Sequence, residues 1–405
     1  MKRWLGVALG IVTSVGGFLE IGSITTAAQA GAEYKYQLAW TIVLGTICIG
    51  LLIEMAGRFA AVSKHTIADA MRERFGLHFF MVPLILIFFV SLLVLAAEIG
   101  GVAVSIELVT GVHFPVWALP SALLAGGLLW YGTFSIIENG ISLLGLITIA
   151  FVVAGVQLGI DWHGLGAGLL PSMPHKEPAH YWFIAVSILG ASVSPYLFYF
   201  YSSGAIEEKW DEKNLAPNRV IAAIGMGFGG FLSVAVLVVA ALVFAPRGIK
   251  VEEYRQLPML LSTSWGRTGF AIFAGSLFIT CLGATAEIAL ALAYKIAQGF
   301  GWNWGEDLAP SDDARFSLTY TVILLVAALL EVVGIDPLKL TTLSMALTAA
   351  SLPVAIVPFL VLMNDRKYLR DHTNGWLGNL AILIISLLAG VVAVVSIPLE
   401  IVGGS

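Results

Sequence analysis

The stretch that decides the fold runs from Gly16 to Thr26 and reads GGFLEIGSITT. It lies inside an apolar run long enough to cross a lipid bilayer, yet it contains a carboxylate, glycines and three hydroxyls. Such groups are tolerated at membrane depth only where protein or a water-filled cavity surrounds them. The stretch therefore predicts an interrupted membrane helix beside a polar site, centred on Glu20.

A second interruption is predicted five spans later, where Gly190 to Tyr196 reads GASVSPY. Pro195 removes a backbone donor and disturbs a helix. Two broken spans at this separation are typical of inverted repeats, spans 1–5 and 6–10, with the substrate site where the repeats meet. For either span alone, a simple proline kink with satisfied hydroxyls is the alternative. The matching positions favour a transport site.

Composition places the whole chain in the membrane. Of its 405 residues 59% are hydrophobic and 12% are charged, whereas a soluble domain carries about 25% charged residues. Apolar runs of about 20 residues recur without a soluble block, which indicates one membrane domain, residues 1–405. The two cysteines form neither a disulfide framework nor a metal-ligand pattern, and no basic tract suggests nucleic acid.

The hydropathy pattern predicts an all-α integral membrane protein of about eleven transmembrane helices, with repeats near 5–159 and 181–363 and an extra helix at 375–399. The N-terminus imitates a secretory signal ending at Ala28-Gln29-Ala30. We interpret it as a span because the run is long and polar in its middle. The predicted spans are 5–31, 37–61, 77–107, 116–133, 136–159, 181–203, 219–245, 268–298, 316–334, 340–363 and 375–399.

Loop charges predict the orientation. If the N-terminus is cytoplasmic, two thirds of the 21 Lys and Arg residues fall on the inner side. Inner loops carry the excess of basic residues in most membrane proteins. We therefore expect a cytoplasmic N-terminus and an external C-terminus, in a membrane that we take to be a prokaryotic plasma membrane.

Several short stretches, in this order and spacing, resemble the NRAMP family of proton-coupled divalent-metal transporters. The resemblance covers spans 1 to 10 and implies a LeuT-like 5+5 inverted repeat with helices 1 and 6 broken. Each stretch is weak alone, and together they are fairly specific for the scaffold. They are Ala30 to Trp40, Arg72 to Phe75, Ala97 to Gly101, Ile136 to Glu138, and Leu352 to Pro358.

The family's metal-site motifs are replaced. Aligned through Ala30-Gly31, the family's Asp-Pro-Gly-Asn falls on Glu20, Ile21, Gly22 and Ser23. The span-6 set of alanine, methionine, proline and histidine falls on Ala191, Ser194, Pro195 and Tyr196; a second histidine falls on Tyr201, and a span-10 glutamine falls on Met345. Met173-Pro174-His175 spells the family tripeptide, but we interpret it as a polar loop.

These replacements predict an all-oxygen metal site formed by Glu20, Ser23, the Ala191 carbonyl and Ser194, with Gly22, Tyr196 and Met345 completing the substrate site. Oxygen ligands suit Mg²⁺, Ca²⁺ or Mn²⁺ better than softer metals. One carboxylate is few for a dehydrated ion, so magnesium would keep several waters.

Coupling to protons is expected to be weak or absent, because tyrosines do not titrate near neutral pH as histidine does. The intramembrane carboxylates Glu98, Glu138 and Glu287, together with Tyr201, are the candidate coupling or gating residues. For Glu98 and Glu138 the alternative is a neutral carboxyl that holds two helices together.

The sequence therefore predicts a secondary transporter of a hard divalent cation, with the lipid bilayer and the transported ion as its partners and no cofactor. Transport of a small anion or organic molecule on the same scaffold is the alternative, because exposed helix ends bind anionic groups. A membrane receptor or enzyme is disfavoured, since no nucleophile–base set or nucleotide loop is present.

Overall fold

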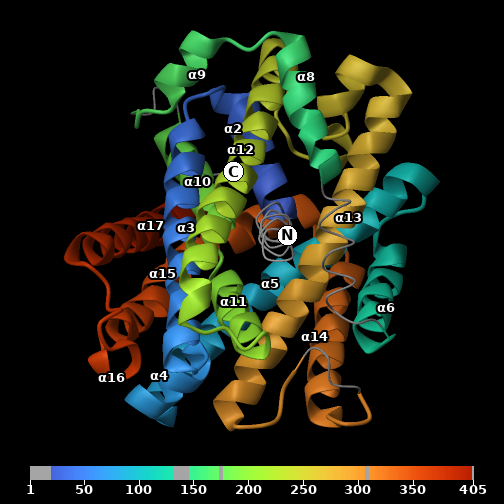
Figure 1. Cartoon of the computed structure of the whole chain (residues 1–405). Helices are drawn as coiled ribbons and strands as arrows, with labels where there is room; N and C mark the ends of the chain where they lie inside the picture. Colours follow the sequence, from blue (N-terminus) through green and yellow to red (C-terminus); the bar gives the residue numbers. More distant parts are fainter. Residues whose placement is uncertain (1–19, 132–145, 173–176, 306–309, 404–405) are drawn as a thin grey trace.

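A computed structural model describes residues 20–131, 146–172, 177–305 and 310–403. Within those ranges the regular structure is entirely helical, as predicted, and contains no strand (Figure 1). Glu138 and the tripeptide Met173-Pro174-His175 lie outside the described residues.

The described helices follow one another along the chain. Their bounds are α2 Ile21–Tyr34, α3 Ala39–Ser63, α4 Ile67–Phe75, α5 Leu77–Thr110, α6 Pro115–Tyr131, α8 Ala150–Leu158, α9 Trp162–Gly168, α10 Pro178–Ser192, α11 Pro195–Glu207, α12 Leu215–Val243, α13 Met259–Phe300, α14 Ala314–Val332, α15 Pro337–Met363, α16 Arg366–Leu369 and α17 Trp376–Gly403.

Eight described segments are long and apolar enough to cross a membrane, with α10 and α11 counted as one. The apolar helices Pro115–Tyr131 and Ile147–Leu158 are shorter, and the first predicted span is described only from residue 20 onward. The predicted span 136–159 is likewise described only from residue 146 onward. The predicted count of eleven is therefore not confirmed, although each of the other nine predicted spans coincides with a described helix or helix pair.

The break predicted in the sixth span is present. Helix α10 ends at Ser192, and α11 begins at Pro195. Between them Val193 (φ −119°, ψ 67°) and Ser194 (φ −79°, ψ 121°) leave the helical conformation. At the start of α2, Glu20 is likewise extended (φ −109°, ψ 176°). Helices α2 and α11 thus both begin inside the protein.

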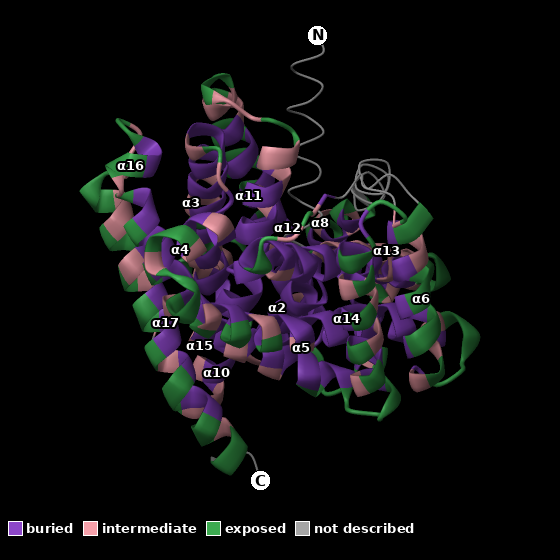
Figure 2. Ribbon diagram, turned by 90° about the horizontal axis from the view of Figure 1, so that it is seen from below, coloured by how far each residue is buried: buried purple, intermediate pink, exposed green. Residues whose placement is uncertain are grey.

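The distribution of buried and exposed residues distinguishes the central helices from those at the edge of the bundle. Helices α2 and α10 and residues 91–105 of α5 are largely buried at the centre, whereas α17 and α6 carry exposed faces at the edge (Figure 2). The exposed side chains of α17 include Leu388, Val391 and Val394. Apolar residues on the outward face are expected where the solvent is lipid rather than water.

Glycines bring the central helices into backbone contact. A Cβ added at Gly190 of α10 would lie 1.8 Å from the carbonyl oxygen of Met345 in α15. One added at Gly31 of α2 would lie 2.2 Å from the carbonyl oxygen of Leu237 in α12. No other residue fits these positions, so the two half-helices α2 and α10 are held against α12 and α15.

A polar cluster joins α2, α10 and α17 near their ends. His180 Nδ1 lies 2.8 Å from Glu400 Oε1, and His180 Nε2 lies 3.3 Å from Glu33 Oε1. The second oxygen of Glu33 faces Lys250 Nζ at 3.5 Å, which also lies 3.9 Å from Glu177. The last helix is therefore attached to both half-helices, α2 and α10, through one imidazole.

Candidate functional site

Glu20 is the centre of the site. Its side chain is buried (1% exposed) and accepts a hydrogen bond from the Tyr196 hydroxyl at 2.6 Å. Ser194 Oγ lies 3.4 Å from the other carboxylate oxygen and 3.3 Å from the Gly190 carbonyl oxygen. The carboxylate at the first break therefore reaches the hydroxyls of the second break, which joins the two predicted motifs in space.

Glu98 of α5 contacts the residue that follows Glu20 in the chain. One of its oxygens accepts a hydrogen bond from the Ile21 N–H at 3.1 Å, and the other oxygen has no hydrogen-bond partner among the described residues. The first N–H groups of a helix have no partner within the helix, so Glu98 satisfies one at the start of α2. Two buried carboxyl groups are thus placed at one helix end.

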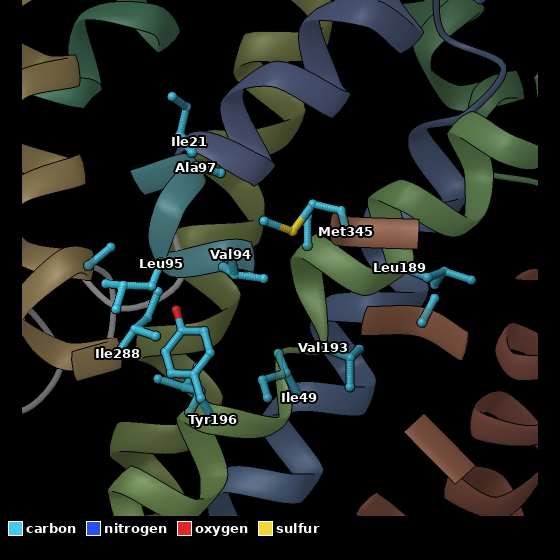
Figure 3. Close-up of a cluster of buried hydrophobic side chains, with 14 of the residues drawn as sticks. Ile21, Ile49, Val94, Leu95, Ala97, Leu189, Val193, Tyr196, Ile288 and Met345 are labelled. Carbon is cyan, nitrogen blue, oxygen red and sulfur yellow. The ribbon is translucent and has the colours of Figure 1, made fainter. Parts of the chain in front are cut away.

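Gly22 and Met345 are in direct contact. A Cβ at Gly22 would lie 2.3 Å from the Met345 methyl carbon and 2.6 Å from its sulfur. In Figure 3 the ends of the Met345 and Tyr196 side chains both point toward the part of α5 that carries Val94. The thioether of α15 therefore lies next to the first turn of α2, where any side chain larger than that of glycine would displace it.

Backbone carbonyls at the end of α10 are available for binding. The residue four positions after Ala191 is Pro195, which has no N–H. The Ala191 carbonyl therefore cannot accept the ordinary helical hydrogen bond. Ser23 is buried in the first turn of α2. The atoms in this region that could bind a metal ion are mostly oxygens. They belong to the Glu20 carboxylate, to hydroxyl groups and to the Ala191 carbonyl at the end of α10.

The other predicted residues are spread over different places. Tyr201 donates a hydrogen bond to Asn218 of α12 at 3.1 Å, further along α11 than Tyr196 and directed to a different helix. Glu287 is partly buried in α13 and close enough to Tyr196 for an electrostatic interaction. Glu138 lies outside the described residues.

Two buried titratable residues were not among the predicted site residues. Glu331 of α14 is fully buried without a hydrogen-bond partner among the described residues, and it packs against Gly100. Lys295 of α13 is buried with its ammonium 4.1 Å from the centre of the Tyr199 ring. Both lie within predicted spans, and a titratable residue in a membrane span is a reason to expect a functional role. Among the described residues, no group of three His, Cys, Asp or Glu side chains is arranged to hold a metal.

Replacing Tyr196 by phenylalanine is expected to destabilise the folded protein by about 1.5–3 kcal/mol, because it removes the hydrogen bond that the tyrosine hydroxyl donates to the Glu20 carboxylate. Tyr201→Phe is the matched control, because it removes a bond to a neutral amide that is worth about 0.5–1.5 kcal/mol. Thermal unfolding in detergent measures both. Equal shifts for the two variants would show that the Glu20 contact is not special.

The fold and the site define a membrane transporter in which a buried carboxylate at the start of α2 faces the interruption between α10 and α11. Residues 10–398 match the Nramp family, described as natural resistance-associated macrophage protein-like. The chain belongs to that family. It is 25% identical over 397 residues to the divalent metal cation transporter MntH of Yersinia enterocolitica, covering 91% of this chain and 90% of that one.

Solved structures show the same fold. A manganese transporter of Eremococcus coleocola, crystallised with an aromatic bis-isothiourea substituted compound, matches with a TM-score of 0.78 and 18% identity over 98% of this chain and 92% of that one. MhsT, solved with L-phenylalanine, matches with a TM-score of 0.64 and 13% identity, covering 96% and 97%. The LeuT-like architecture that the family resemblance implies is confirmed.

Proposed function

We propose that this protein moves a divalent metal ion across the membrane and that Glu20 binds the ion. The observation that carries the proposal is the buried Glu20 carboxylate between the two helix breaks, within hydrogen-bond reach of Ser194 and Tyr196. The names of two similar proteins support it, one a divalent metal cation transporter and the other a manganese transporter.

The donor set favours a hard cation such as Mg²⁺, Mn²⁺ or Ca²⁺. Glu20, Ser23, Ser194 and the Ala191 carbonyl offer oxygen only, and such ligands suit hard ions. Soft metals are best held by thiolate and imidazole, and the described residues present no cluster of three such groups or carboxylates. With one carboxylate as ligand, the ion keeps part of its water shell.

Transport of an anionic solute is the second candidate, and the arrangement of Glu98 disfavours it. An anion would bind at the free N–H groups that begin a helix. At α2 one of these groups already donates to Glu98, and Glu20 stands at the same end. At α11 the first residue is Pro195, which has no N–H. Two carboxyl groups would repel the anion.

Uptake into proteoliposomes tests the proposal. We expect Mg²⁺, Mn²⁺ or Ca²⁺ to enter vesicles containing the protein faster than empty vesicles, and Cd²⁺ to enter more slowly than the preferred ion. A pH-sensitive dye inside the vesicles should report little acidification, because tyrosines stand where the family places histidines. No flux of any of the three hard ions would overturn the proposal.

Met345→Leu is expected to leave hard-ion uptake within about threefold of the unchanged protein. The two side chains have similar volumes, and such exchanges in a core usually cost less than about 1.5 kcal/mol. A hard ion also gains little from a thioether. The measurement is initial Mn²⁺ uptake, with the expressed amount as a control. A loss beyond about tenfold would make the sulfur a ligand.

We further propose that the N-terminus is cytoplasmic and the C-terminus external, in a prokaryotic plasma membrane. The excess of Lys and Arg on one side supports this orientation. Labelling single cysteines placed at Lys339 and Lys367 with an impermeant reagent in intact cells tests it. We expect labelling at position 339 only, and the reverse pattern would invert the assignment.

A further inference from the structure

Helices α15 and α17 form a wedge that opens toward one end of the bundle. They touch where Gly390 faces Pro353, since a Cβ at Gly390 would lie 2.6 Å from the proline ring. From that contact toward Met363 and Trp376 the two helices border a groove of about 810 Å³. Its size falls within the range of about 300–1,000 Å³ found for small-molecule sites.

The walls of the wedge are apolar and open to the surroundings. Val357 and Val361 of α15 lie on one side, and Leu380 and Leu383 of α17 lie on the other. Val361 is 43% exposed and Leu380 is 45% exposed. Both helices belong to spans long enough to cross the membrane, so this surface faces hydrocarbon and offers a fit to an acyl chain.

The mouth of the wedge is polar and carries a net positive charge. Arg74 donates a hydrogen bond to Asp365 at 2.8 Å, so these two charges offset each other. The Lys367 N–H and the Arg74 guanidinium hold the pKa of Asp365 below its usual range, which keeps that pair ionised at neutral pH. Arg366 is exposed and makes no side-chain ion pair or hydrogen bond with the residues that the structure describes.

The position of this polar mouth matches the surface of a bilayer. Trp376 is 71% exposed at the rim, and tryptophan is enriched where membrane and water meet. Helix α4, which carries Arg74, lies beside α16 at the same end of the molecule (Figure 1). An uncompensated arginine at the headgroup level, above an apolar cleft, is complementary to a phosphate ester with a hydrocarbon tail.

We propose that this wedge binds one anionic phospholipid, with its phosphate at Arg366 and an acyl chain between Val361 and Leu380. The apolar walls select a chain, and the net charge at the mouth selects an anionic headgroup over a zwitterionic one. Asp365 is already paired with Arg74, so it does not compete with a lipid phosphate for Arg366.

Native mass spectrometry of the full-length protein in detergent tests the proposal, with phosphatidylglycerol and phosphatidylcholine as probes. We expect one phosphatidylglycerol to remain bound at an activation energy that removes phosphatidylcholine. Arg366→Gln should weaken phosphatidylglycerol binding by about fivefold, the effect of about one basic residue at a membrane surface. Lys339→Gln, at the other end of α15, is the matched control and should change nothing.

A second variant tests the acyl-chain part. Val361→Trp fills the wedge and should abolish the retained lipid, whereas Val326→Trp on the exposed face of α14 should keep it. Three results would overturn the proposal: equal retention of the two lipids, unchanged binding by both Arg366→Gln and Val361→Trp, or a dimer that Val361→Trp dissociates. Arg366→Gln alters an exposed side chain, so it remains informative if Val361→Trp fails to fold.

Discussion

Glu20→Gln is expected to reduce divalent-metal uptake by about 1.5 to 3.5 orders of magnitude while leaving the protein folded. The amide oxygen of glutamine can still accept the Tyr196 hydrogen bond, so the packing at the break is preserved. The ion loses the charge of its proposed carboxylate ligand. Removing one charge from a buried, hydrogen-bonded pair costs about 2–5 kcal/mol, and each 1.4 kcal/mol is a factor of ten in affinity.

Initial uptake in proteoliposomes and metal binding by calorimetry measure this change together. Glu252→Gln is the matched control, because that carboxylate is exposed in a loop and should leave uptake unchanged. Unfolding temperature separates loss of function from loss of fold. If Glu20→Gln transports at the original rate, Glu20 has a structural role and the ion binds elsewhere.

Gly190→Ala is expected to lower the stability of the protein by about 3 kcal/mol, the upper end of the usual cost of overpacking. The added methyl group would lie 1.8 Å from the Met345 carbonyl oxygen and 3.0 Å from the Ala349 nitrogen. Both are backbone atoms of α15 and cannot rotate away. The helices must separate, which displaces Met345 from Gly22 and disturbs the turn that carries Ala191, so uptake should also fall.

The same substitution at Gly227 of α12 is the control with the opposite sign. Nothing lies within 4 Å of a Cβ at that position. Alanine stabilises a helix by about 0.5–1 kcal/mol relative to glycine. The thermal unfolding temperature should therefore rise slightly for Gly227→Ala and fall strongly for Gly190→Ala. A small change of the same sign in both would contradict the close contact between α10 and α15.

The sequence was most informative where structure follows from local chemistry. The predicted span 340–363 lies within α15, Pro337–Met363, because hydrophobic length determines a membrane helix. The break at Ser194 follows from Pro195, whose effect extends over only a few residues. Likewise, a carboxylate in the middle of an apolar run identified Glu20 as a site residue before its partners were known.

The remaining features depend on how distant helices pack. Glu98 and Ile21 are 77 positions apart, so only the placement of α5 against α2 makes the carboxylate a cap for that helix. The contact of Met345 with Gly22 likewise requires α15 to cross α2 at one register. Glu331 was not singled out because its proximity to Gly100 arises from the packing of α14 on α5. No local pattern encodes these distances.

The imidazole that joins α17 to the half-helices has an acid–base consequence. A neutral histidine has one N–H, and an ionised carboxylate can only accept. His180 touches Glu33 and Glu400 at once, so both contacts are hydrogen bonds only when the joint holds one extra proton. Lys250 and Glu177, the other charged groups there, do not supply it. The contact of α17 with α2 and α10 therefore depends on a bound proton. Raising the pH removes this proton and weakens the contact.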